Sequence, residues 1–156
     1  MKIHERVKSG INILPMLEEV VKNWSDFELD TSRQENIDCQ KETQTIQLIA
    51  PDYSDGVHER GGPDSCRYTD EWIKYPRVHE FLEWFAETYH GQLYRVSIVH
   101  LPSGGKVYRH ADEGSYYEDK HRFHLVLSGY YDVTVIKDTE KFKAGELWTF
   151  NNKKVH

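Results

Sequence analysis

The sequence predicts an α+β domain whose body is a β-sandwich or barrel. Apolar residues follow a helical period in parts of the first 92 residues, and the period changes to two from Leu93 onward. The chain has 156 residues, of which 38% are hydrophobic and 13% aromatic, enough to bury a sizeable core. Helices followed by a run of antiparallel-looking strands are typical of the α+β class. We therefore expect one domain over 1–156, with a helical and loop portion at 1–92 and a β-rich core at 93–156.

Two segments have the apolar spacing of amphipathic helices. The members of the first stripe lie three or four positions apart and are Leu14, Leu17, Val20, Val21 and Trp24. The second stripe runs from Val78 to Tyr89, with Pro76 just ahead of it and His90-Gly91 just behind. Proline at a helix start and glycine after its end are common boundary signals, so this segment is the clearest helix prediction.

Strands are predicted where apolar and polar residues alternate. One lies at 43–50, and four more lie at 93–101, 121–129, 131–138 and 146–152. The material between the last two, DTEKFKAG at 138–145, is read as a turn region. A long polar segment rich in Gly, Pro and Asp occupies 51–76, and we expect it to be either a functional lid or simply mobile.

Charge and cysteine content restrict the class of partner and the compartment. The net charge of -6 disfavours non-specific nucleic-acid binding, which needs clustered Lys and Arg. No apolar run approaches the ~20 residues of a membrane span, and the first ten residues lack the apolar core of a secretory signal. Cys39 and Cys66 have no CxxC spacing, and two thiols are favoured over a disulfide. These features predict a cytoplasmic protein without a membrane or nucleic-acid partner.

The stretch HADEG contains two possible metal ligands. Residues i and i+2 of an extended segment point to the same side, so His110 and Asp112 can converge while Ala111 faces away. A third candidate, His156, follows 46 positions later, at the end of a strand expected beside the strand at 93–101. Two imidazoles and one carboxylate form the facial triad of non-haem Fe(II) oxygenases. The alternative interpretation is a simple turn at HADEG and a solvated histidine at 156.

Three motifs in this order resemble the catalytic core of the aspartyl/asparaginyl β-hydroxylase family. They are HADEG, RFHLVLSG and GELWTFNNKKVH, and the resemblance covers residues 93–156. Members of that family are Fe(II)- and 2-oxoglutarate-dependent dioxygenases on a double-stranded β-helix, a cupin-like jelly roll. The resemblance thus implies a jelly-roll catalytic core at 93–156, with Fe(II) as cofactor and with 2-oxoglutarate and O2 as cosubstrates. It further implies hydroxylation of an amino acid, or of an Asp or Asn side chain in a peptide.

Several residues match functional positions of that family. His110 and His156 match the iron-binding histidines, and Asp112 occupies the position of the triad carboxylate. Arg122 and His124 match an Arg-x-His pair that binds 2-oxoglutarate, since a guanidinium suits a carboxylate, and Ser97 resembles a serine that helps to hold the same molecule. The other interpretations are a surface ion pair for Arg122 and a core position for His124.

One departure from the family concerns the cosubstrate. The family has an arginine some ten residues beyond the second histidine, which anchors the far carboxylate of 2-oxoglutarate, and this sequence stops at His156. Three interpretations are open: a truncated jelly roll without its last strand, a substitute residue, or weak cosubstrate binding. Two other functions are also open. They are a non-oxidising cupin-type metal-binding protein or sensor, and a non-catalytic interaction domain.

Overall fold

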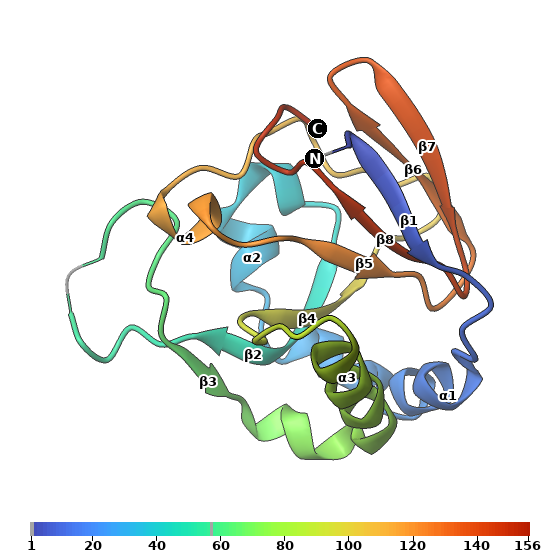
Figure 1. Cartoon of the computed structure of the whole chain (residues 1–156). Coiled ribbons are helices and arrows are strands. Elements are labelled where there is room, and N and C mark those ends of the chain that lie inside the picture. Colours follow the sequence, from blue (N-terminus) through green and yellow to red (C-terminus); the bar gives the residue numbers. More distant parts are fainter. Residues whose placement is uncertain (1, 57) are drawn as a thin grey trace. The chain divides into compact units, whose positions relative to one another are not determined.

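The computed structural model describes residues 2–56 and 58–156 (Figure 1). The chain divides into two units. Unit 1 consists of Met1–Leu17, Glu59–Gly62 and Arg109–His156, and unit 2 consists of Glu18–His58 and Pro63–Tyr108. The structure confirms the α+β class, with helices and antiparallel sheets. The sheets do not close into a barrel within the described ranges, so the jelly roll stays a prediction. The same holds for a single dioxygenase-like domain over 1–156.

Unit 1 is built mainly from short antiparallel strands. Its elements are β1 (His4–Lys8), α4 (Ser115–Glu118), β5 (Phe123–Leu125), β6 (Tyr130–Val135), β7 (Asp138–Lys143) and β8 (Leu147–Phe150). One sheet has the order β1-β8-β5, and β6 and β7 form a separate hairpin (Figure 1). Helix α1 (Leu14–Lys22) begins in unit 1 and ends in unit 2.

The core of unit 1 lies between the hairpin and the three-stranded sheet. Five buried residues form one cluster: Val126, Val135, Phe142, Trp148 and Phe150. The ring of Phe142 stacks on that of Trp148 at a centroid distance of 4.4 Å. Trp148 and Phe150, which alternate along β8, both contribute to this core. Because aromatic rings bury large apolar areas, this cluster supplies much of the hydrophobic stabilisation of the unit.

Strand β7 corrects the sequence prediction, which assigned 138–145 to a turn region. The six residues of β7 pair with β6 from Val135↔Asp138 to Tyr130↔Lys143, which leaves Ile136 and Lys137 as a two-residue turn. Only Phe142 of β7 is buried, so the strand has almost no apolar alternation for a sequence pattern to detect. Ile136 has a φ of 62°, which is unusual for a β-branched residue.

Strand β8, which leads to His156, has neighbours other than the expected one. It pairs with β1 through Glu5↔Thr149 and with β5 through His124↔Trp148. The strand at 93–101 was considered as its neighbour in a rolled sheet, but that strand, β4 (Val96–His100), pairs with β2 (Gln44–Pro51). Strand β1 was not predicted because its sequence, HERVK, is polar and its residues are exposed or only half-buried.

Unit 2 contains the second sheet, of order β3-β2-β4, and most of the helical turns. Its remaining elements are η1 (Trp24–Glu28), α2 (Ser32–Asn36), η2 (Asp38–Gln40), β3 (Cys66–Tyr68), η3 (Asp70–Lys74) and α3 (Pro76–Thr88). Strand β2 confirms the strand predicted at 43–50. The polar segment at 51–76 was predicted to be loop throughout, and β3 and η3 correct this. Val57 of that segment lies outside the described residues.

The two predicted helices are confirmed, and one of the two buried faces differs from the prediction. In α1 the buried side chains are Met16 and Val20, whereas Leu14 and Val21 are exposed. Helix α3 buries Val78 and Leu82 of its predicted stripe. Among the described residues, no helix is both long and apolar enough to cross a membrane. Cys39 and Cys66 are not joined by a disulfide.

Candidate metal centre

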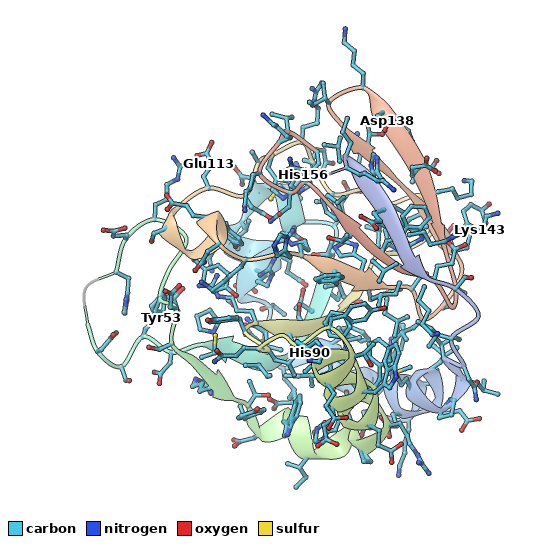
Figure 2. All side chains as sticks on the ribbon, viewed as in Figure 1. Tyr53, His90, Glu113, Asp138, Lys143 and His156 are labelled. Atoms are coloured by element: carbon cyan, nitrogen blue, oxygen red, sulfur yellow. The ribbon has the colours of Figure 1, made fainter. Side chains whose placement is uncertain are left out.

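The last residue of the chain lies beside His110 through backbone pairing. The N–H of His110 donates to the carbonyl of His156, and the N–H of His156 donates to the carbonyl of His110, each at 2.9 Å. This reciprocal pair is the hydrogen-bonded arrangement of two antiparallel residues. The hairpin turn also holds the segment, because the Ile136 N–H donates to the Val155 carbonyl at 2.8 Å. Two histidines 46 positions apart in sequence thus become neighbours. Figure 2 labels His156 among the side chains of the structure.

Asp112 completes a compact group of three possible ligands. One ligand atom from each of His110, Asp112 and His156 can be chosen so that all three atoms lie within 4.8 Å of one another. The imidazole rings of the two histidines have centroids 4.3 Å apart, and His110 Nε2 lies 3.6 Å from Asp112 Oδ1. The predicted convergence of the three side chains is therefore what the structure shows, and it comes from the backbone pairing.

The two oxygen atoms of Asp112 have different surroundings. Oδ2 accepts a hydrogen bond from Asn152 Nδ2 at 2.7 Å and pairs with Arg122 Nη2 at 2.9 Å. Oδ1 is the oxygen nearer to His110 Nε2. The side chain of Asp112 is only 8% exposed, and charge-assisted hydrogen bonds of this kind stabilise a buried carboxylate.

His156 presents one of its ring nitrogens without a hydrogen-bond partner. Its Nδ1 lies 2.8 Å from the Lys154 carbonyl, which only accepts, so Nδ1 carries the proton and donates. The other nitrogen, Nε2, is buried and has no hydrogen-bond partner within residues 2–56 and 58–156. Burial lowers the pKa of the His156 imidazole, and the nearby His110 lowers it further. A neutral imidazole with its lone pair on Nε2 is the form that binds metals.

The predicted cosubstrate residues Arg122 and His124 both lie in unit 1. Arg122, 29% exposed at its side chain, pairs with Asp112, so it is an ion-pair partner of the triad carboxylate. His124 Nδ1 shares a 2.9 Å hydrogen bond with the hydroxyl of Tyr131, and its ring packs edge-on against Phe150. Desolvation by burial lowers the pKa of His124 to about 3, and the charge of Arg122 acts in the same direction. His124 is thus a neutral histidine against the core.

Ser97 belongs to unit 2, whereas the other predicted site residues belong to unit 1. It is an exposed residue of β4, in register with Gln47 of β2. Its part in holding 2-oxoglutarate stays a prediction.

Part of the long polar segment belongs to unit 1, next to the triad. The backbone of Arg60 and Gly61 packs so closely on Glu113 and Gly114 that a Cβ on Gly114 would overlap the Arg60 carbonyl. Gly114 has a φ of 110°, which favours glycine. An ion pair of 2.6 Å joins Arg60 Nη1 to Glu113 Oε2. The segment Glu59–Gly62 is therefore held against the two residues that follow Asp112.

Sequence reasoning missed Asn152. The sequence analysis gave it no role, and the structure places it in a turn in which the Lys154 N–H donates to the Asn151 carbonyl. Asn152 is nevertheless only 3% exposed, and its amide contacts Asp112. A turn has no periodicity that marks one of its residues as buried. The contact follows only from the pairing of residues 110 and 156, which is not a local property of the sequence.

The donor set fits a divalent first-row transition metal. It offers two imidazoles and one carboxylate, a combination used by sites that keep open coordination positions. The buried Nε2 of His156 has no hydrogen-bond partner among the described residues, which is costly unless a bound group satisfies it. Asp112, His110 and His156 are each only partly exposed, so a bound ion would be partly shielded from water.

Comparisons of the chain with protein-family models, with curated proteins and with solved structures found no match. The resemblance to the aspartyl/asparaginyl β-hydroxylase family consequently stays a prediction from the motifs alone.

Proposed function

We propose that this chain is an Fe(II)- and 2-oxoglutarate-dependent dioxygenase, with Fe(II) held by His110, Asp112 and His156. The observation that carries the proposal is the pairing of His110 with His156, which brings both imidazoles to the carboxylate of Asp112. By the family resemblance, the substrate is an amino acid, or an Asp or Asn side chain in a peptide. A double-stranded β-helix around the triad is part of the same proposal.

Two of the three ligands, His156 and Asp112, are oriented for a cation by their surroundings. His156 donates from Nδ1 to Lys154, which orients the ring and leaves Nε2 as the ligand atom. Asp112 presents Oδ1, since its other oxygen is occupied by Asn152 and Arg122. When bound, Fe(II) supplies the redox chemistry that uses O2 and 2-oxoglutarate to hydroxylate a C–H bond, with succinate and carbon dioxide as co-products.

Arg122 and His124 are proposed to contact 2-oxoglutarate. A guanidinium has five N–H donors, so the contact with Asp112 leaves donors for a second carboxylate. His124 is neutral, because desolvation lowers its pKa to about 3, and it adds no positive charge beside the iron. The segment Glu59–Gly62, packed against Glu113 and Gly114, is proposed as part of the substrate entrance.

A second candidate is a metal-binding protein or sensor of the cupin type that oxidises nothing. One observation favours it: Arg122 Nη2 forms an ion pair with Asp112 Oδ2 at 2.9 Å. If this ion pair persists in the metal-bound state, Arg122 neutralises a ligand and does not bind a cosubstrate. The two candidates share the metal site and differ in whether 2-oxoglutarate binds.

An anaerobic titration with Fe(II) and then 2-oxoglutarate separates the candidates. The dioxygenase predicts a visible charge-transfer band that appears only with both additions, and succinate after O2 is admitted. The sensor predicts Fe(II) binding without the band and without succinate. His110→Ala should abolish Fe(II) binding, whereas His121→Ala, a change at an exposed histidine of the same unit, should not. Absence of Fe(II) and Mn(II) uptake by the unaltered chain at neutral pH would contradict both candidates.

A further inference from the structure

The metal-binding competence of Asp112 depends on which of its oxygens faces the two histidines. A carboxylate can rotate and offer either oxygen, or both, to a cation. Here Oδ2 is held by two donors, Asn152 Nδ2 at 2.7 Å and Arg122 Nη2 at 2.9 Å, whereas Oδ1 is the oxygen near His110. The carboxylate orientation is therefore set by donors on the oxygen other than the one near His110.

Asn152 holds Asp112 at two points. Besides its amide contact with Oδ2, its backbone carbonyl accepts the Asp112 N–H at 3.0 Å. The residue is itself fixed, since it is 3% exposed and its own N–H donates to the Phe150 carbonyl at 2.9 Å. A short buried side chain with two anchored backbone groups loses little freedom when it binds, so it is a rigid support for the carboxylate.

Asn152 and Arg122 differ in what they do to the charge of Asp112. Arg122 is a cation on a long, 29% exposed side chain, and it competes electrostatically with a metal ion for the carboxylate. The amide of Asn152 is neutral, so it orients the carboxylate and leaves the negative charge for the cation. Outer-shell hydrogen bonds of this kind typically raise metal affinity 10- to 100-fold.

We propose that Asn152 is the positioning residue of the metal centre, which holds Asp112 so that Oδ1 alone is presented to the ion. This inference rests on the metal site of the proposed function. It does not depend on 2-oxoglutarate or on turnover, so it can be tested on the chain with a metal ion only.

The test is a double-mutant cycle on Ni(II) affinity, measured by calorimetry. Ni(II) is the probe because imidazole is a suitable ligand for it. Ni(II) also binds a given site more tightly than Mn(II), Fe(II) or Co(II), so binding by the two histidines alone stays measurable. Asn152→Ala should weaken Ni(II) binding about 10-fold or more. In an Asp112→Ala background the same change should alter the affinity less than about twofold, because the residue acts through Asp112. A purely structural role would weaken binding equally in both backgrounds.

Two further variants control for loss of the fold. Asn152→Leu keeps the branched shape of the side chain without its donor and should match Asn152→Ala. Asn151→Ala changes the neighbouring asparagine, whose Oδ1 accepts from the Lys153 N–H, and should leave Ni(II) affinity unchanged. Unaltered affinity in both Asn152 variants, or equal losses in both backgrounds, would overturn the inference while the metal site stands. Failure of the unaltered chain to bind Ni(II) would overturn the metal site itself.

Discussion

At the scale of single residues, the histidines of unit 1 occupy contrasting surroundings. His156 carries a buried ring nitrogen without a partner, whereas His124 packs on Phe150 and shares a hydrogen bond with Tyr131. The first arrangement leaves a lone pair for a ligand. The second keeps an imidazole neutral at the edge of the core, because a charge there would lack solvation.

His124 predicts a pH dependence of stability. Its pKa falls from an ordinary 6.5 to about 3 on folding, so the unfolded chain binds the extra proton between these values. The contribution of His124 is therefore fully present above about pH 6.5 and is lost as the pH falls toward 3, with a slope of at most about 1.4 kcal/mol per pH unit.

Denaturant unfolding at several pH values between 7 and 4 measures this slope. The variant His124→Gln does not titrate, so its free energy of unfolding should fall less steeply over this range than that of the unaltered chain. Parallel pH profiles for the two proteins would show that His124 does not make this contribution.

At the scale of elements, the triad depends on loops held by their neighbours. The turn between β6 and β7 binds Val155, and the segment Glu59–Gly62 packs on Glu113 and Gly114. Neither contact follows from strand or helix periodicity. The turn contact fixes Val155, the residue before His156. The contact of Glu59–Gly62 fixes Glu113 and Gly114, the residues after Asp112.

Gly114 provides a test of the second contact. Gly114→Ala introduces a Cβ that overlaps the Arg60 carbonyl at a φ of 110°, so the free energy of unfolding should fall by on the order of 3 kcal/mol. Gly129→Ala is the matched control, since Gly129 also has a positive φ but has no atom within 4 Å of the added Cβ. The control should lose about 1 kcal/mol. Equal losses in chemical denaturation would mean that the packing of Glu59–Gly62 adds no stability.

The elements that the sequence predicted correctly are those with a strong apolar pattern. Helix α3 and strand β6 bury residues at the expected period, whereas β2 and β8 are apolar and buried on both faces. Strand β7 was missed because only Phe142 is buried in it, and the buried face of α1 was misjudged because exposed apolar residues such as Leu14 and Val21 extend its stripe. An apolar pattern predicts which residues are buried only when the exposed positions of the element are polar.

At the scale of the whole molecule, the proposed metal joins distant parts of the sequence. His110 and Asp112 are separated from His156 by more than forty residues, which include the hairpin and β8. The three motifs suggested this proximity through the family resemblance, but the local pattern could not have predicted it. The pairing of His110 with His156, and the burial of Asn152 that accompanies it, arise only when the chain is folded.

Metal binding should therefore stabilise the folded chain. A ligand that binds only the folded state adds about 2.7 kcal/mol at a free concentration 100 times its Kd. Mn(II) should raise the midpoint of thermal unfolding of the unaltered chain and of His121→Ala, and chelation should reverse the rise. His110→Ala should show no such rise, because it lacks one of the three ligands. A rise of the same size in His110→Ala would indicate that Mn(II) binds elsewhere.

The most direct measurement is an anomalous-scattering map from a crystal of the chain grown with Mn(II). We predict one strong peak per chain, in contact with His110, with Oδ1 of Asp112 and with Nε2 of His156. Ordered density for these three side chains with no peak between them, or with the Mn(II) bound by other residues, would contradict the metal centre and the dioxygenase proposal built on it.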